Sequence, residues 1–413
     1  MIHKVAIMLP HYYKGGTLRA AKNIAKQIAV GARLSGDEVG VVFSYVGGDH
    51  YDKNEDFLDL LDNNIEVRET FWNQVPKEDC VYLSRLLRFP VSQYGSPYYS
   101  IPNDGANDFY DCDFWIIISD RLSAPVLPLR KYIIVTYDYI QRYVPEIFSE
   151  TLWNLQTNSF FPIVKNAEAV FVTTPSTMDD LISYAGVPKN RVVLFENSFD
   201  ELQVGEIKEN ADIRRISDDY FVWTTNTTNH KNHIRALKAL EKYYSYYNGT
   251  LKIVITGGNT KYFDPSFQGT DKFLMNHPYI KSISNLIENS RILQEKMTIL
   301  GELSDLEYMQ TVQEAKFIWH PNLYDNGTFS VIEAGYLGIP ALSSKYPAME
   351  FIENAYKLNM RFFDPYNISI MAKALKEMEI SYKYVILPSK EDLLSHTWYK
   401  NAHQTYLLFK EFF

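Results

Sequence analysis

The sequence contains little of what marks several large classes of protein. It has 413 residues but only two cysteines, Cys80 and Cys112, which excludes a disulfide scaffold and leaves no zinc-ligand spacing. No uninterrupted apolar run approaches the ~20 residues of a membrane-spanning helix, and the apolar stretch at the N-terminus is too short for a signal peptide. The net charge of −9 argues against binding to nucleic acid. These absences predict a cytoplasmic protein.

The composition is otherwise that of an ordinary globular protein. Hydrophobic residues make up 46% and charged residues 22% of the chain, and the length suggests two or three domains. Aromatic residues reach 15%. Because aromatic rings stack on sugar rings but also fill cores, this abundance does not by itself distinguish a carbohydrate-binding protein from any other.

The N-terminal segment alternates strand and helix patterns. Residues 4–10 form an apolar run typical of a buried parallel strand, 17–34 have a helical pattern with Thr17 as N-cap, and 39–44 form the next strand. This order predicts the opening of a doubly wound α/β sheet. The first turn contains Gly15-Gly16 but lacks G-x-G-x-x-G, which argues against a Rossmann oxidoreductase.

Two α/β-patterned halves follow one another along the chain. Core strands are predicted at 114–119 and 132–136 in the first half, whereas 47–113 shows no clear period. Residues 201–219 are charged and poor in apolar side chains, as in a linker. We therefore predict domains at 1–200 and 220–394 and a C-terminal helix within 395–413.

The segment from His320 to Ser344 combines acidic residues with a turn and a helix. Asp325 precedes a small, polar turn, and Glu333 is expected to open a helix that ends before Pro340. Backbone N–H groups and the positive end of a helix dipole suit a phosphate or a sugar hydroxyl. A Glu that merely complements a helix dipole is the alternative interpretation.

One acid eight positions before another is also the arrangement in retaining glycosyltransferases of family 4, whose usual form is Glu-Gly-Phe-Gly followed by Leu-Glu-Ala. The chain resembles that family, with Asp325 where the first Glu normally stands. Asp138 matches the family's His-Asp, with Tyr137 in place of the histidine. Lys231 matches a loop lysine, but the arginine usual about five residues earlier is absent at Asn226.

The resemblance runs in order from Gly15-Gly16 to Trp398 and implies the GT-B fold, two Rossmann-like doubly wound domains with an interdomain cleft. In the family the last helix crosses back to the first domain, which receives the acceptor. Glu333 would accept hydrogen bonds from the donor's ribose, Asp325 would hold the donor sugar, and Lys231 would stabilise the leaving diphosphate. The catalytic residues implied are Asp138, Lys231, Asp325 and Glu333. The donor-binding residues implied are Gly15, Gly16, Lys231, Asn232, Asn326, Gly327, Thr328, Phe329 and Glu333.

The implied activity is transfer of a hexose from a GDP-, UDP- or dTDP-linked donor to a hydroxyl of a glycan or lipid-linked acceptor, with retention, in bacterial surface polysaccharide synthesis. No cofactor is expected. Asp111-Cys112-Asp113 resembles a metal motif of another glycosyltransferase architecture, but it precedes a buried strand without partner ligands, so we predict no metal site. The departures at Tyr137, Asn226 and Asp325 leave open a catalytically inactive glycosyltransferase-like subunit.

A basic stripe lies along the helix predicted at 17–34. Arg19, Lys22, Lys26 and Arg33 fall within a sector of roughly 60° at 100° per residue, and Val30 falls in the same sector. Such a stripe predicts peripheral contact with anionic lipid at the inner face of the plasma membrane. A solvated outer face is the alternative.

Overall fold

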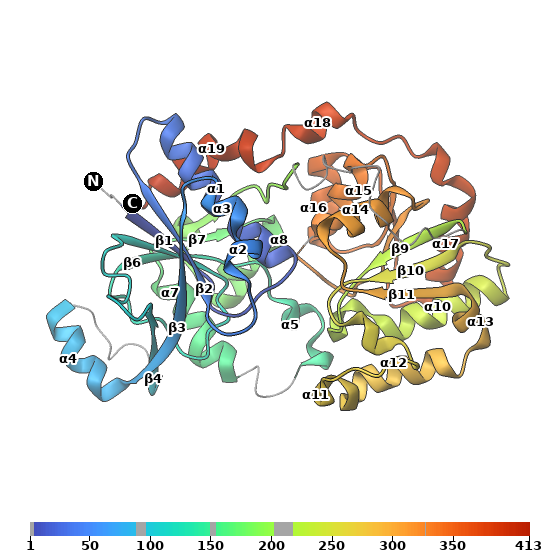
Figure 1. Ribbon diagram of the computed structural model, residues 1–413, viewed down its shortest axis with the longest axis horizontal. Coiled ribbons are helices and arrows are strands. Elements are labelled where there is room, and N and C mark those ends of the chain that lie inside the picture. The colour runs from blue at the N-terminus through green and yellow to red at the C-terminus, as the bar shows by residue number, and fades with distance from the viewer. Residues whose placement is uncertain (1–3, 88–95, 149–153, 202–217, 327) are drawn as a thin grey trace. The chain divides into compact units, whose positions relative to one another are not determined.

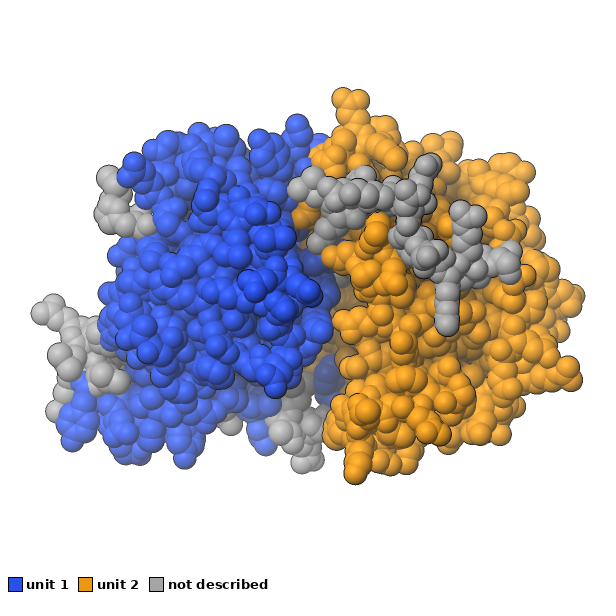
Figure 2. Space-filling view, viewed as in Figure 1, with its two compact units in different colours: residues 1–139, 148–199, 395–413 blue, residues 140–147, 200–394 orange. Residues whose placement is uncertain are grey.

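The computed structural model describes residues 4–87, 96–148, 154–201, 218–326 and 328–413. The chain forms two compact units (Figures 1 and 2). Unit 1 comprises residues 1–139, 148–199 and 395–413, and unit 2 comprises 140–147 and 200–394. The short segment 140–147 thus belongs to unit 2 although unit 1 flanks it on both sides in the sequence. Most of the predicted linker, 202–217, lies outside the described residues.

Unit 1 is built on an eight-stranded sheet in the order β4-β3-β2-β1-β5-β6-β7-β8. All neighbours are parallel except β3 and β4, which pair antiparallel. The strands are β1 (Lys4–Met8), β2 (Gly40–Val46), β3 (Glu66–Pro76), β4 (Tyr98–Asn103), β5 (Phe114–Ile118), β6 (Lys131–Val135), β7 (Val170–Val172) and β8 (Val192–Leu194). The α-helices are α1 (Gly16–Leu34), α2 (Lys53–Asp56), α3 (Leu58–Leu61), α4 (Lys77–Leu87), α7 (Phe161–Asn166), α8 (Pro175–Asp180) and α19 (Trp398–Lys410).

Unit 2 is built on a six-stranded, all-parallel sheet in the order β11-β10-β9-β12-β13-β14. The strands are β9 (Tyr220–Thr224), β10 (Lys252–Thr256), β11 (Met297–Gly301), β12 (Ile318–His320), β13 (Ala341–Ser344) and β14 (Arg361–Phe363). The α-helices are α5 (Ile140–Tyr143), α10 (His233–Ser245), α11 (Lys272–Asn276), α12 (Pro278–Glu288), α13 (Arg291–Lys296), α14 (Asp305–Gln313), α15 (Phe329–Tyr336), α16 (Pro347–Tyr356), α17 (Ile368–Ser381) and α18 (Lys390–Leu394).

Both sheets contain the strand order of a Rossmann fold. When the strands of unit 2 are numbered in chain order, they lie in the order 3-2-1-4-5-6 across the sheet. In unit 1 the strands β3-β2-β1-β5-β6-β7 have the same order when β4 is left out of the numbering. Successive strands are added on one side of β1 and then, from β5 onward, on its other side in unit 1, and the same change occurs between β9 and β12 in unit 2. Ligands of such sheets bind beyond the carboxyl ends of the strands at this switch point.

The central strands are apolar throughout because the sheet of unit 1 has a core on each face. Val5 and Ile7 of β1 pack into one cluster, whereas Ala6 and Met8 pack into another. Successive side chains of a strand point to opposite faces, so a strand buried on both sides reads as a continuous apolar run. This explains why residues 4–10 were recognisable from the sequence as a central strand.

Helix α1 differs in two respects from the sequence prediction. It begins at Gly16, and its N-cap is Gly15 rather than Thr17. Its basic stripe is also partly covered within unit 1: Lys26 is paired with Asp59 at 3.2 Å and lies 4.7 Å from the centre of the Trp398 ring. The Lys26 side chain is 3% exposed. The prediction of a lipid-facing stripe is therefore wrong for the middle of this helix.

The same sector of α1 is the one that α19 covers. Val30 packs against Trp398 and Ala402, and a Cβ atom on Gly31 would lie 2.4 Å from the Ala402 carbonyl oxygen. Glycine at position 31 lets the two helix backbones approach closely. Val30 is 7% exposed and so does not provide the membrane contact that the sequence suggested.

The described residues of 47–113, which lack a clear hydrophobic period in the sequence, include the strands β3 and β4. Strand β3 continues past its parallel pairing with β2 into an antiparallel pairing with β4, from Phe71 opposite Asn103 to Pro76 opposite Tyr98. Strand β3 exposes many side chains, which removes the apolar signal of a central strand. No helix among the described residues is both long and apolar enough to cross a membrane.

Candidate functional site

A cluster of hydrogen-bonded polar side chains lies at the topological switch point of unit 2. Lys231 is in the loop that follows β9, and Asp325 is in the loop that follows β12, at the carboxyl ends of two adjacent strands. The two residues are 94 positions apart in the sequence, and the Lys231 Nζ donates a hydrogen bond to Asp325 Oδ2. Parallel pairing of β9 with β12 therefore brings together two of the predicted catalytic residues.

The ion pair is largely enclosed by protein. The side chains of Lys231 and Asp325 are 14% and 15% exposed. Burial raises the pKa of the Asp325 carboxyl, but the charge and hydrogen bond of Lys231, together with smaller contributions from His230 and His320, more than offset burial and lower the pKa to about 2. Asp325 is consequently a carboxylate at neutral pH, and it can act as a hydrogen-bond acceptor only.

Further hydrogen bonds orient the Asp325 carboxylate. The amide of Asn322 donates to Asp325 Oδ2 at 2.8 Å and to His320 Nε2 at 3.0 Å, and the backbone N–H of Asn326 donates to Asp325 Oδ1 at 2.9 Å. Burial lowers the pKa of His320 to about 3, so this ring is neutral and accepts through Nε2. Sequence reasoning missed His320 and Asn322, although both belong to the segment it singled out.

Asn232 joins the loops around this cluster. Its backbone has a φ of 66°, and its side-chain amide donates to the carbonyls of Pro321 at 3.0 Å and Pro365 at 2.9 Å. The Leu323 N–H also donates to the His230 carbonyl at 2.8 Å. Because both amide hydrogens of Asn232 are used within the protein, its side chain holds together the loops after β9, β12 and β14.

A second contact of this site comes from the segment 140–147. Tyr143 stacks on Tyr324 with ring centres 3.9 Å apart and an interplanar angle of 7°. Tyr324 immediately precedes Asp325 and is 3% exposed. The stack fixes the residue next to the ion pair, and no short-range sequence signal could have revealed it because 181 positions separate the two tyrosines.

Helix α15 begins earlier than the sequence suggested. Thr328 is its N-cap and accepts a hydrogen bond from the Ser330 N–H at 3.2 Å, and Phe329 is its first residue. Glu333 therefore lies in the second turn and does not open the helix; it is 2% exposed. Asp325 and Glu333 still lie on either side of the helix N-terminus. Gly327 lies outside the described residues.

The predicted residues of unit 1 lie beyond the carboxyl ends of β1, at the switch point of its own sheet, and of β6, two strands away. Gly15 follows β1 and has φ 63° and ψ −135°, a conformation suited to glycine, and a Cβ atom there would meet nothing within 4 Å. Gly16 is the first residue of α1. Asp138 follows β6, and its backbone carbonyl accepts from the guanidinium of Arg121 at 2.9 Å. The sequence analysis did not single out Arg121.

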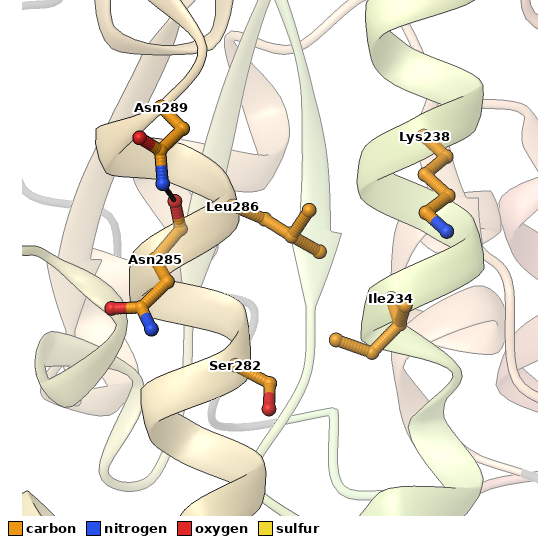
Figure 3. A pocket seen from close by; sticks show the side chains of 6 residues that line it. All are labelled: Ile234, Lys238, Ser282, Asn285, Leu286 and Asn289. Carbon is orange, nitrogen blue, oxygen red and sulfur yellow. Dashed lines mark hydrogen bonds between the residues drawn. The ribbon is translucent and has the colours of Figure 1, made fainter.

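A separate groove lies between α10 and α12 (Figure 3). It has a volume of about 420 Å³ and is lined by Ile234, Lys238, Ser282, Asn285, Leu286 and Asn289. The lining includes no histidine or carboxylate and none of the residues around the Lys231–Asp325 pair. The groove therefore offers no carboxylate or imidazole, and the loop cluster at the strand ends is the stronger candidate site.

Comparison with known structures identifies the architecture as GT-B. HepE from Anabaena, solved with UDP and glucose, matches with a TM-score of 0.65 and 14% identity over 100% of each chain. Sucrose-phosphate synthase from Thermosynechococcus elongatus matches with a TM-score of 0.63 and 12% identity, over 99% of this chain and 98% of that one. The lipopolysaccharide outer core galactosyltransferase WaaB matches with a TM-score of 0.55 and 14% identity, over 98% and 99%.

The fold class predicted from the sequence is thus confirmed: the protein has two parallel-sheet α/β units of the GT-B type. Residues 208–391, which make up most of unit 2, match the family described as Glycosyl transferases group 1. That match includes Lys231, Asp325 and Glu333. No curated protein sequence matches the chain.

Proposed function

We propose that the protein is a glycosyltransferase that moves a hexose from a nucleotide-sugar donor to a hydroxyl of a glycan or lipid-linked acceptor, with retention of the anomeric configuration, in bacterial surface polysaccharide synthesis. The observation that carries this proposal is the buried Lys231–Asp325 pair at the switch point of unit 2. It lies inside the segment that matches the Glycosyl transferases group 1 model.

The chemistry of the pair suits a diphosphate leaving group. An ammonium has three hydrogens, and one donated to Asp325 leaves two for diphosphate oxygens. Transfer breaks the bond between the anomeric carbon and a diphosphate oxygen, so negative charge grows on the diphosphate. A lysine held in a largely enclosed site stabilises that charge without rearranging. Asp325, as a carboxylate, would accept hydrogen bonds from hydroxyls of the donor sugar.

The other donor contacts follow from the same segment. The N-terminus of α15 would supply backbone N–H groups, and Glu333 would accept from the ribose hydroxyls. In unit 1, a Cβ at Gly15 would occupy open space, so the backbone where α1 begins is accessible to a ligand. The bound UDP of HepE and the outer-core galactosyltransferase activity of WaaB are consistent with a nucleotide donor and a surface glycan product.

Nucleotide binding is the first test. A thermal-shift panel with UDP, GDP and dTDP should identify one nucleotide that stabilises the protein. A nucleotide at one hundred times its dissociation constant adds ~2.7 kcal/mol of stability. If none of the three raises the melting temperature, the proposal that this is a nucleotide-sugar enzyme fails.

Turnover tests the assigned residues. Lys231→Ala should lower kcat for donor hydrolysis or transfer more than it raises the KM for donor, because the charge it neutralises grows as the bond breaks. Glu333→Gln should weaken donor binding by roughly 1.5–3 kcal/mol, as expected for a charge-assisted hydrogen bond. Lys345→Ala is a matched control, since the Lys345 side chain in the same unit is 61% exposed. An effect of Lys231→Ala on KM alone would limit this lysine to ground-state binding.

A catalytically inactive, glycosyltransferase-like subunit is the second candidate. Asp325 stands where the family carries Glu, and Tyr137 stands where it carries His. This candidate predicts nucleotide binding without turnover. Measurable donor hydrolysis by the wild type, lost in Lys231→Ala, would exclude it, and NMR of the product's anomeric proton would decide between retention and inversion.

A further inference from the structure

An exposed stack of aromatic rings lies at the carboxyl ends of β1 and β2 in unit 1. Tyr12, in the loop after β1, stacks on His50, in the loop after β2, with ring centres 4.1 Å apart at 27°. Tyr12 is 38% exposed, and His50 is exposed as well. Both loops lie at the ligand-binding edge of this sheet, where β1 is one of the two strands at the switch point.

Tyr51 holds the loop that carries Tyr12 in place. The hydroxyl of Tyr51 accepts a hydrogen bond from the Tyr13 N–H at 2.9 Å and donates one to the Tyr13 carbonyl at 2.7 Å. The centre of the Tyr51 ring lies 5.1 Å from that of Tyr12, in an edge-to-face arrangement, and 5.3 Å from that of the fully buried Phe57. A row of rings therefore connects the exposed Tyr12 to the core of unit 1.

The loop that carries His50 is fixed by an acidic residue. Glu69 of β3 accepts a hydrogen bond from the Gly48 N–H at 3.2 Å through one carboxylate oxygen. Glu69 is exposed, so its carboxylate retains acceptor capacity for a ligand hydroxyl. Lys14, in the loop that carries Tyr12, has its Nζ 5.8 Å from the centre of the Tyr12 ring.

We propose that the Tyr12–His50 stack binds a sugar ring of the acceptor, with Glu69 accepting a hydrogen bond from one of its hydroxyls. This inference rests on the proposed function, and it assigns the acceptor to the glycan class. The C–H bonds on one face of a pyranose are slightly positive and fit the negative face of an aromatic ring. Since the loops are already held by Tyr51 and Glu69, little ordering is needed when the sugar binds.

Saturation-transfer NMR with methyl glycosides of gluco, galacto and manno configuration tests the proposal. At least one glycoside should receive magnetisation at its ring C–H protons in the wild type and in Tyr12→Phe, which keeps the ring. Tyr12→Ala should weaken binding about five- to tenfold, as expected when one aromatic contact is lost. Tyr98→Ala is the matched control, because Tyr98 is a 46% exposed tyrosine of β4 in the same unit.

Each outcome decides the question. Binding that survives unchanged in Tyr12→Ala, or a wild type that binds none of the glycosides, overturns the proposal. Sedimentation with phosphatidylglycerol vesicles that depends on Tyr12, without glycoside binding, would instead indicate a lipid headgroup and also overturns it. Stabilisation by UDP, GDP or dTDP in the same preparations keeps this failure separate from failure of the glycosyltransferase proposal, because Lys231 and Asp325, which carry that proposal, belong to unit 2.

Discussion

Removing one partner of the Lys231–Asp325 pair should destabilise the protein far more than removing both. In Lys231→Met the Asp325 carboxylate stays in its enclosed position, 15% exposed, without the ammonium. Breaking a buried pair from one side costs about 3–5 kcal/mol because it leaves an uncompensated charge. The double variant Lys231→Met/Asp325→Asn carries no such charge, so it should be more stable than Lys231→Met alone.

The pH dependence of stability gives an independent magnitude. The folded-state pKa of Asp325 is about 2, against an ordinary value of 3.8. A depressed pKa contributes stability that is fully present above the unfolded value and is lost as pH falls through the folded value. The difference of about two pKa units corresponds to roughly 2–3 kcal/mol at about 1.4 kcal/mol per unit. This contribution should disappear between about pH 4 and pH 2 and should be absent in Asp325→Asn.

Urea unfolding followed by tryptophan fluorescence measures both effects, because Trp223 and Trp319 lie in the core of unit 2. The four proteins of the double-mutant cycle should be compared at neutral pH, and the wild type and Asp325→Asn should also be compared in acid. A loss below about 0.5 kcal/mol in Lys231→Met, or additive losses in the double variant, would refute the assignment of a buried, strongly coupled pair.

Two further predictions concern the packing of α1. In thermal melts, Gly31→Ala should lower stability by about 1–3 kcal/mol despite the higher helix propensity of alanine, because its Cβ would lie 2.4 Å from the Ala402 carbonyl oxygen. Gly258→Ala is the control and should be tolerated, because a Cβ there meets nothing within 4 Å. Lys26→Met should cost more than 1 kcal/mol through the loss of its contacts with Asp59 and Trp398, whereas replacement of the exposed Arg33 by Gln should stay within about 0.5 kcal/mol. Equal effects of the two charge changes would restore the solvated-stripe interpretation of this helix.

The candidate site shows where local pattern stops being informative. Lys231 and Asp325 were recognisable separately, because each follows a strand pattern and precedes a helix pattern. Their contact was not, since it depends on β9 pairing with the distant strand β12 on one side as well as with β10, the next strand in sequence, on the other. The start of α15 was misplaced for a related reason: buried Phe329 extends the helix toward its N-terminus, and a polar turn sequence concealed that boundary.

The basic stripe of α1 shows the same limit for a surface. Helical periodicity correctly placed Lys22, Lys26 and Val30 on one side, but it could not say what covers that side. The covering residues come from α3 and α19, and Trp398 is 372 positions away from Lys26. A helical wheel describes the directions of side chains, whereas exposure depends on distant segments of chain.

The sequence by itself determined the α/β class, the central strands and the segment 320–344, because apolar runs, turn residues and helix caps act over a few neighbouring residues. Tertiary structure alone decided which loops meet at the two switch points, that Tyr143 joins unit 2, and that α19 covers α1. Those outcomes depend on strand order and on close packing between segments far apart in the chain. No periodicity within one segment specifies such contacts, because their free energy comes from surfaces that only the folded chain brings together.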